Sequence, residues 1–366
     1  MDYETPLFFY VMEYAGDADH DVIDMVSGNP DWGPPPALRE GLREYAELDD
    51  EHFLYPPSEG LRELREEIAA RRNVDPGQVL ITNGGGEANY LSMARALERE
   101  RGSEVILTDP VYPYYPGKTK MLGGTARFVA TDRDGSLDPE RVRTVANEDT
   151  ACIVVNTPNN PSGAVYGEAT MEALVTIAEE YDALVVSDEV YDHYDFSGEF
   201  TSALAFDSDH RVVTNSFSKS MAITGLRVGY AIFPSDLVDV AATRHMLTNV
   251  TSSRPSMYAV LNALRETPPS YYEERRAQLA DRVDRFTEAL DAAGAEYTRP
   301  AGGFYVMARF EGYPGTLENV ERLIDEAGVA GMPGETFGSA REEWLRFALV
   351  SPRVEEAAGR LASFFA

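Results

Sequence analysis

The 366-residue sequence contains a single cysteine, Cys152, and only three lysines, Lys118, Lys120 and Lys219. One cysteine excludes a disulfide framework and a cysteine-based metal cluster. The first fourteen residues lack the basic and apolar regions of a secretory signal. No run approaches the ~18–20 apolar residues that a membrane span requires. These absences together predict a cytoplasmic protein.

Basic charge is also scarce: 32 Lys and Arg residues stand against 62 Asp and Glu, a formal charge of −30. A surface this acidic repels phosphate backbones and anionic lipid, which argues against nucleic-acid and membrane partners. An acidic, lysine-poor surface suits a protein in multimolar salt, where the Debye length falls to ~3 Å near 1 M. The alternative is an acidic protein of ordinary salt. In both cases, each of the three lysines is a candidate for a specific function.

The length predicts two domains. From about residue 60 to 235, Val/Ile-rich runs alternate with helical patterns, which favours an α/β fold with a mostly parallel central sheet. The strands expected there are Val79–Thr82, Glu104–Thr108, Ala151–Asn156, Ala183–Ser187, Arg211–Thr214 and Val228–Phe233. We expect residues 30–265 to form this large domain.

The remaining residues, 1–29 and 266–366, are expected to form a small α+β domain. A long charged helix is predicted over Tyr271–Ala293, with strands near Phe304–Ala308 and Trp344–Val350. The aromatic residues Phe8, Phe9, Tyr10 and Tyr14 are expected to pack this domain rather than to bind a ligand.

Three glycines, Gly84 to Gly86, follow a predicted strand and open the helical run Ala88–Glu98. Glycines at a helix start let backbone N–H groups approach an anion, and the helix dipole favours negative charge there. The spacing matches neither a dinucleotide fingerprint nor a Walker loop. The motif is therefore either a phosphate cradle or a tight structural turn.

Two polar motifs stand at the carboxyl ends of predicted strands, where α/β sheets place ligands. The loop from Asn156 to Gly163, rich in Asn and Pro, presents Asn160 as both donor and acceptor. An Asx turn is its structural alternative. Asp188 ends the next strand, where a carboxylate is costly unless it meets a cation, or else caps a helix.

Lys219 lies in Ser216-Phe217-Ser218-Lys219, among small hydroxyl and apolar residues rather than in a charged run. A desolvated lysine has a lowered pKa and serves as a nucleophile or a base. In a chain with three lysines, this environment favours chemistry over a surface role.

Taken in order, the glycine turn, the Asn/Pro loop, Ser187-Asp188-Glu189-Val190-Tyr191 and the Lys219 motif with a following Gly-x-Arg-x-Gly resemble the class I/II aminotransferases. The sequence is accordingly identified as a member of that family, of a haloarchaeal-like acidic type. The resemblance implies a fold-type I enzyme that depends on pyridoxal 5′-phosphate (PLP). The implied cofactor-binding residues are Gly85, Gly86, Tyr112, Asn160, Asp188, Tyr191, Ser216, Lys219, Arg227 and Tyr55, and the implied substrate-binding residues are Gly28, Asn160 and Arg346.

The resemblance also implies the role of each residue. Lys219 would be the catalytic residue, as the Schiff-base lysine and proton shuttle. Asp188 would pair with the pyridinium nitrogen, Tyr191 and Asn160 would bond the phenolic oxygen, and Tyr112 would stack on the ring.

The phosphate cup would be formed by Gly85, Gly86, Ser216 and Arg227. Tyr55 would reach the phosphate of a neighbouring subunit, so the site would require a homodimer.

Arg346 would bind the α-carboxylate of the substrate, the alternative being an exposed arginine on a strand. Position 86 is glycine where many relatives carry lysine, so the phosphate cup would rely on backbone more than on charge. Arg254 either binds a second, distal carboxylate of the substrate or is a solvent-facing loop arginine.

The implied activity is transfer of an amino group from an L-amino acid to a 2-oxo acid, 2-oxoglutarate being the expected acceptor, by a ping-pong mechanism. The amino donor is left open. A PLP-dependent C–S β-lyase on the same fold is the alternative. No metal is expected, because the five histidines show no ligand spacing: His20, His52, His193, His210 and His245.

Overall fold

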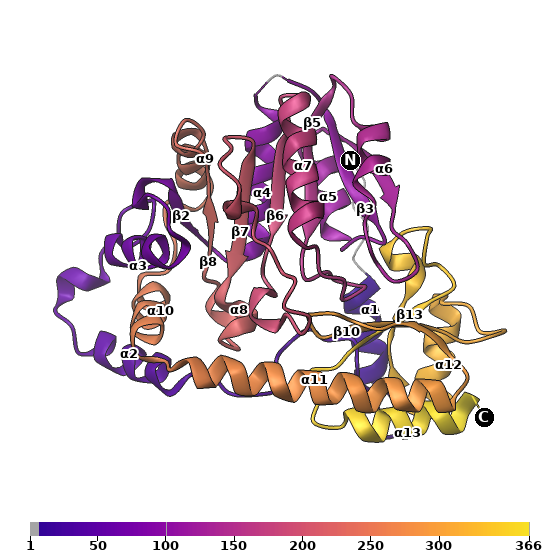
Figure 1. Cartoon of the computed structure of the whole chain (residues 1–366). Coiled ribbons are helices and arrows are strands. Elements are labelled where there is room, and N and C mark those ends of the chain that lie inside the picture. Colours follow the sequence, from indigo (N-terminus) through magenta and orange to yellow (C-terminus); the bar gives the residue numbers. More distant parts are fainter. Residues whose placement is uncertain (1–6, 100, 366) are drawn as a thin grey trace.

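The structure is a computed structural model and describes residues 7–99 and 101–365. Within these residues the largest sheet has seven strands in the order β2-β8-β7-β6-β5-β3-β4 (Figure 1). Its strands are β2 (Val79–Thr82), β3 (Glu104–Asp109), β4 (Thr125–Ala130), β5 (Thr150–Asn156), β6 (Leu184–Asp188), β7 (Arg211–Ser216) and β8 (Gly229–Ile232).

The strands β4, β3, β5, β6 and β7 are parallel to one another. Strand β8 runs antiparallel to both β7 and β2. The prediction of a mostly parallel sheet is therefore confirmed, and so are its six predicted strands, within one or two residues at each end. Edge strand β4 was not predicted, because Val129 is its only buried residue and it carries no apolar run.

Alternate side chains of each strand point to opposite faces of this sheet, and helices cover both faces. Ile153 and Val155 pack in the same apolar cluster as Leu174 of α7, whereas Cys152 and Val154 pack with Leu91 of α4. In Figure 1, α7 lies in front of the sheet and α4 lies behind it. The helices of this part are α2 (Pro36–Ala46), α3 (Arg62–Arg72), α4 (Gly85–Leu97), α5 (Tyr114–Met121), α6 (Pro139–Val145), α7 (Glu168–Glu180), α8 (Phe217–Ser220), α9 (Val238–Asn249) and α10 (Arg254–Glu266).

A second group of elements comes from both ends of the chain. Strands β12, β13, β10 and β9 form an antiparallel sheet in that order, and β1 pairs in parallel with β11. Val11 and Ile23 share one apolar core with Leu323 and Phe347, more than 290 positions away. These elements are α1 (Leu7–Gly16), β1 (Ile23–Asp24), α11 (Pro269–Ala292), β9 (Glu296–Thr298), β10 (Tyr305–Arg309), α12 (Leu317–Ala327), β11 (Val329–Ala330), β12 (Met332–Pro333), β13 (Leu345–Ala348) and α13 (Val354–Phe365).

The two groups meet at the carboxyl ends of the parallel strands. Strands β5, β6 and β7 end at Asn156, Asp188 and Ser216, on the side of the sheet that faces β10 and β13 (Figure 1). A small apolar cluster that contains Tyr194 and Phe304 joins the two groups there. This arrangement places the polar strand ends against the second sheet, where a ligand can be enclosed between them.

In the part of the chain that the structure describes, no helix combines the length and the apolar character needed to cross a membrane.

Candidate active site

A cavity of about 350 Å³ opens between the strand ends and the second sheet. It is lined by all the predicted site residues but one: Gly28, Gly85, Gly86, Tyr112, Asn160, Asp188, Tyr191, Ser216, Lys219, Arg227 and Arg346. The exception is Tyr55, which is 81% exposed and lies outside the cavity. The fold therefore brings together residues that lie as far apart as positions 28 and 346.

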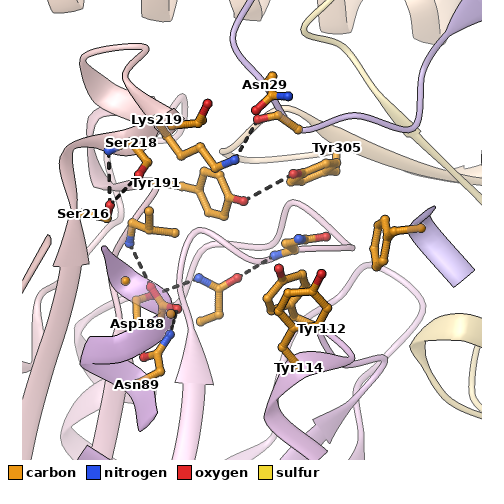
Figure 2. A pocket seen from close by; sticks show the side chains of 18 of the residues that line it. Asn29, Asn89, Tyr112, Tyr114, Asp188, Tyr191, Ser216, Ser218, Lys219 and Tyr305 are labelled. Atoms are coloured by element: carbon orange, nitrogen blue, oxygen red, sulfur yellow. Dashed lines mark hydrogen bonds between the residues drawn. The ribbon is translucent and has the colours of Figure 1, made fainter. Parts of the chain in front are cut away.

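Lys219 enters the cavity from the short helix α8, which starts at Ser216. Ser216 caps this helix by accepting a hydrogen bond from the N–H of Ser218. The Nζ of Lys219 donates to the carbonyl of Gly28 at 2.7 Å (Figure 2). A Cβ on Gly28 would lie 2.3 Å from the hydroxyl of Tyr305 and 3.3 Å from Nζ, so only glycine permits this close approach.

The electrostatic surroundings of Lys219 favour its neutral form. Burial, followed by the positive charges of Arg346 and Arg227, lowers the pKa of Lys219 to about 8, against an opposing contribution from Asp188. At pH 7 about a tenth of the side chain is then an uncharged amine, far more than for an ordinary lysine, and this is the nucleophilic and basic form.

Asp188 is a buried carboxylate, 5% exposed, held by neutral donors. It accepts hydrogen bonds from Asn89 Nδ2 and the Tyr115 hydroxyl, each at 2.6 Å, and from the N–H of Val190 at 3.2 Å. Burial raises the pKa of Asp188 more than these bonds lower it. Since no described ammonium or guanidinium forms an ion pair with it, the site can accommodate a cationic group opposite this carboxylate.

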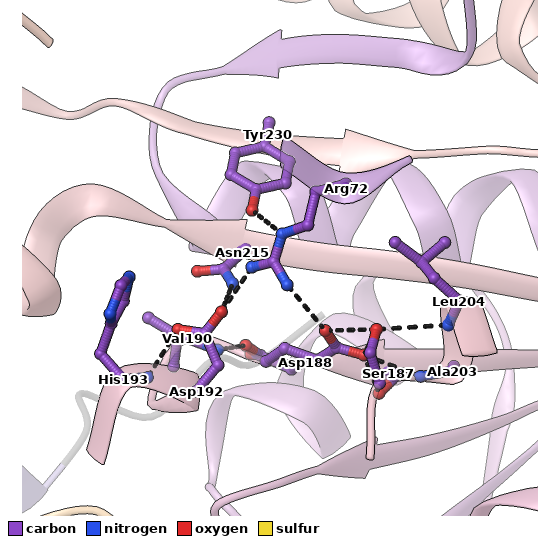
Figure 3. Close-up of polar contacts among 12 residues, drawn as sticks. Arg72, Ser187, Asp188, Val190, Asp192, His193, Ala203, Leu204, Asn215 and Tyr230 are labelled. Carbon is purple, nitrogen blue, oxygen red and sulfur yellow. Dashed lines mark hydrogen bonds and ion pairs between the residues drawn. The ribbon is translucent and has the colours of Figure 1, made fainter. Parts of the chain in front are cut away.

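A buried ionic network holds the turn after Asp188 (Figure 3). Arg72 forms a hydrogen-bonded ion pair with Asp192, and its Nη1 lies 3.7 Å from a carboxylate oxygen of Glu189. Arg72 Nε also donates to the Tyr230 hydroxyl at 2.9 Å. Burial raises the pKa of Glu189 to about 7. This network fixes the segment from 188 to 192, which carries two of the predicted site residues.

The glycine turn at the start of α4 faces the cavity together with Ser216 and Arg227. Gly84 has φ +85° and supplies no side-chain cap, so the N–H groups of Gly85 and Gly86 have no described partner and are open to an anion, whereas the N–H of Glu87 donates to the Gly84 carbonyl. The guanidinium of Arg227 donates to the carbonyls of Thr224 and Asn83 and forms no ion pair with a described carboxylate. A Cβ on Gly84 would lie 2.5 Å from Arg227 Nη2. The motif combines a tight turn at Gly84 with backbone donors that face the cavity.

Arg346 on β13 is only 1% exposed, so it is not the exposed strand arginine of the alternative interpretation. Its Nη2 donates to the carbonyl of Val26 at 2.5 Å, and its Nη1 reaches Asn160 Oδ1 at 3.3 Å. Its Nε has no partner, and no described carboxylate pairs with the guanidinium. The rings of Tyr305 and Phe8 lie 4.4 and 5.0 Å from its central carbon. A desolvated cation with free donors calls for an anionic ligand.

Tyr191 and Tyr112 also face the cavity (Figure 2). The hydroxyl of Tyr191 donates to that of Tyr305 at 3.3 Å, and burial raises the pKa of both Tyr191 and Tyr112. Both phenols are therefore neutral hydrogen-bond donors at physiological pH.

Some residues behave differently from expectation. Phe8 packs against Phe337 and the core around it, as expected, and it also lines the cavity together with Phe9. Tyr10 and Tyr14 do bind the small-domain helix α12, through Glu321 and Asp325.

Sequence reasoning also missed lining residues, among them Met12, Asn89, Tyr115, Lys118 and Tyr305. A signal existed for Asn89, which stands one helical turn after Gly85 and therefore on the same face of α4.

Two residues left open by the sequence lie outside the cavity. Arg254 Nη1 donates to the carbonyls of Glu51 and Leu54, so within this chain it holds the loop before Tyr55. His193 stacks on Tyr272 at 4.3 Å instead of lining the site. Within residues 7–99 and 101–365, no group of three or more His, Cys, Asp or Glu could hold a metal ion.

Comparison with known proteins agrees with this geometry. The family described as aminotransferase class I and II matches residues 20–361. The aspartate/prephenate aminotransferase of Thermus thermophilus is 33% identical over 353 residues, which cover 93% of this chain and 90% of that protein. The aspartate aminotransferase of Bacillus subtilis is 30% identical over 368 residues, with 95% and 92% covered.

Among solved structures, the aspartate aminotransferase of Thermus thermophilus with maleate matches with a TM-score of 0.92 and 31% identity, covering 98% of this chain and 97% of that one. The aspartate aminotransferase of Thermotoga maritima matches with a TM-score of 0.89, 29% identity and coverage of 99% and 97%. The chain belongs to the class I and II aminotransferase family, with the fold-type I architecture. It is a PLP-dependent aminotransferase, which confirms the activity, the cofactor and the fold class expected from the sequence and leaves no support for the lyase alternative.

Proposed function

We propose that this aminotransferase takes its amino group from aspartate and passes it to 2-oxoglutarate, with Arg346 holding the α-carboxylate of each substrate. The observation that carries the proposal is the guanidinium of Arg346, buried in the same cavity as Lys219 and without an anionic partner among the described residues. Aspartate as the donor is supported by the names of the relatives.

The residues that face the cavity fit PLP. The buried Asp188 carboxylate suits a protonated ring nitrogen, because none of the described cations forms an ion pair with it. The first turn of α4, with Gly85 and Gly86, would hold the phosphate together with Ser216 and Arg227, since this region supplies open N–H groups, a hydroxyl and a guanidinium.

The ring itself would lie between the remaining predicted residues. Tyr112 would stack on its face, and Tyr191 and Asn160 would hydrogen-bond its phenolic oxygen. When bound, the cofactor supplies an electron sink for the electron pair left at the substrate Cα.

Lys219 is the residue that we assign to proton transfer. As a neutral amine, its Nζ takes the proton from the substrate Cα and holds it; a pKa of about 8 suits both tasks near neutral pH. The carbonyl of Gly28 positions Nζ at 2.7 Å, on the cavity side that Arg346 also faces. Arg346 thereby fixes the amino acid by its carboxylate and orients Cα toward the lysine.

A single-turnover experiment tests the proposal. Stoichiometric aspartate is expected to convert the bound cofactor to its amino form, seen as a shift in absorbance, and to release one equivalent of oxaloacetate. Added 2-oxoglutarate is expected to restore the original spectrum and to yield glutamate. Failure of aspartate to change the spectrum, while another amino acid does, would overturn the assignment of the donor.

We also propose a homodimer in which Tyr55 reaches the phosphate of the neighbouring site. Tyr55, Leu54 and Phe53 are 81, 67 and 59% exposed, and this apolar loop is held out from the surface by Arg254. Exposure of three large apolar side chains in a row suits an interface between subunits. Sedimentation velocity of the holoenzyme tests it, and a monomer at micromolar concentration would refute it.

The remaining finer proposals concern environment and organisation. We retain domain limits at residues 30–265 for the large domain, with 1–29 and 266–366 for the small one. The charge of −30 and the three lysines support adaptation to high salt and the haloarchaeal-like type. We keep a cytoplasmic location as part of the proposal, to be tested by cell fractionation.

A further inference from the structure

A second lysine lies in the active-site cavity and has no part in the mechanism above. Lys118 stands on α5 and lines the same cavity as Lys219 and Arg346. Its Nζ lies 5.5 Å from the ring centroid of Tyr114 and 6.0 Å from that of Tyr115. Two of the three lysines in the chain thus line one cavity, although 29 of the 32 basic residues are arginines.

The ammonium of Lys118 has no hydrogen bond or ion pair to any residue that the structure describes; its only described partners are the two tyrosine rings. Asp188 is the one carboxylate whose charge acts on it, and that carboxylate already accepts three hydrogen bonds. Burial lowers the pKa of Lys118 to about 8, because its ammonium is partly removed from water. An anionic ligand would offset the cost of this desolvation.

The cavity that Lys118 lines has open space at the start of α4. Helices α4 and α5 pack against each other, and both contribute to the lining. Gly86, on the first turn of α4, has no side chain, and a Cβ placed there would contact nothing within 4 Å. Phe8, Met12 and Tyr114 line the same cavity with apolar surface. Their apolar surfaces suit the methylene groups of a short side chain that ends in a carboxylate.

The groups assigned to the phosphate do not include Lys118. Arg227 and Arg346 act on the pKa of Lys219, whereas among charged groups only Asp188 acts on that of Lys118. The phosphate cup already contains a guanidinium, a hydroxyl and a helix N-terminus. A further cation in the same cavity points to a second anion.

We propose that Lys118 binds the distal carboxylate of a dicarboxylic substrate, while Arg346 binds its α-carboxylate. This inference rests on the proposed function, because it supplies the residue that makes the enzyme select dicarboxylic substrates. An ammonium donates to a carboxylate by charge-assisted hydrogen bonds, which are worth a factor of ~10–100 in affinity. The aromatic lining holds the methylene groups, and Lys118 distinguishes a carboxylate from an apolar end.

The experiment compares wild type with Lys118→Met, which keeps the length of the side chain and removes its charge. Binding of succinate, an unreactive dicarboxylate, and of butyrate, its monocarboxylate counterpart, is measured by calorimetry on the holoenzyme. We expect ~10–100-fold weaker succinate binding and unchanged butyrate binding. The kcat/KM for aspartate should fall by a similar factor, and that for leucine should stay the same or rise. Lys118→Arg should restore much of the preference for succinate, and Lys120→Met, an exposed lysine on the same helix, is the matched control.

Other outcomes would overturn the inference and are distinguishable. Equal losses for both ligands, together with weaker PLP binding in a titration of the apoenzyme, would assign Lys118 to the phosphate. An unchanged preference for succinate in Lys118→Met would remove it from recognition altogether, while the proposed donor would stand if wild type still turns over aspartate. A wild type that converts leucine but not aspartate would refute the proposed donor and this inference together. Lys118→Arg provides a folded comparison if Lys118→Met fails to fold.

Discussion

Replacing Arg346 gives the sharpest test of substrate binding. The guanidinium offers a free Nε and an Nη1 whose only bond is 3.3 Å long, so two donors are available to a carboxylate. Each charge-assisted hydrogen bond to a buried group contributes roughly 1.5–3 kcal/mol. Loss of both in Arg346→Met therefore costs about 3–6 kcal/mol. At about 1.4 kcal/mol per tenfold, this lowers kcat/KM by roughly 10²–10⁴-fold.

Arg346→Lys separates charge from geometry. An ammonium keeps the positive charge but cannot present two parallel donors, so about half of the free energy, roughly a 10–100-fold change, should be recovered. The assay is the rate of the half-reaction against aspartate concentration, followed by absorbance of the bound cofactor. Arg341→Met is the matched control, because Arg341 is also a buried arginine but lies outside the cavity.

The effect of Arg346→Met on PLP affinity separates substrate binding from cofactor binding. Because Arg346 is assigned to the substrate, PLP affinity should change little in Arg346→Met. A variant that saturates with aspartate as wild type does, or one that loses PLP while keeping its substrate affinity, would refute the assignment.

Further predictions concern the cofactor lysine, the ionic network, the subunit contact and the solvent. Borohydride reduction of the holoenzyme should fix the cofactor to Lys219, as peptide mass spectrometry would show; labelling elsewhere would remove Lys219 from its role. In the apoenzyme, the lowered pKa of Lys219 means that its amine becomes neutral as pH rises through about 8 rather than 10.5, so its acylation rate should reach half of its maximum there. Arg72→Met leaves the buried Asp192 unpaired and should lower the free energy of unfolding by about 3–5 kcal/mol in urea melts, whereas loss of an exposed pair such as Arg62–Glu66 should cost less than about 1 kcal/mol. Tyr55→Phe should weaken PLP binding by ~10–100-fold if its hydroxyl donates to a phosphate, and an unchanged dissociation constant would contradict the contact between subunits. Raising KCl from 0.1 M to 2 M should raise the melting temperature, because salt screens the self-repulsion of a −30 chain; a fall would argue for the ordinary acidic protein.

The sequence by itself determined the sheet and the half of the site attached to it. Asn160 follows a buried strand, and Asp188 and Ser216 each end one; since parallel strands end at one edge of a sheet, these polar residues had to meet. Lys219, placed directly after Ser216, shares that edge. For these residues the local sequence pattern is sufficient. A strand buried on both faces forms a distinct run of apolar residues, and the end of that run marks the edge of the sheet.

Other features depended on tertiary structure alone. Phe8 lies on an amphipathic helix at the start of the chain. Nothing in the surrounding sequence indicates that its ring packs against the guanidinium of Arg346, 338 positions later. Alternation around Arg346 suits an exposed strand as well as a buried one, and only the packing of β13 against the N-terminal segment buries its guanidinium. In the sequence, nothing distinguishes Lys118 from Lys120. Only the packing of α5 against α4 places Lys118 in the lining of the cavity. Periodicity reports which face of an element is buried, but which other element covers that face is decided by contacts between distant segments.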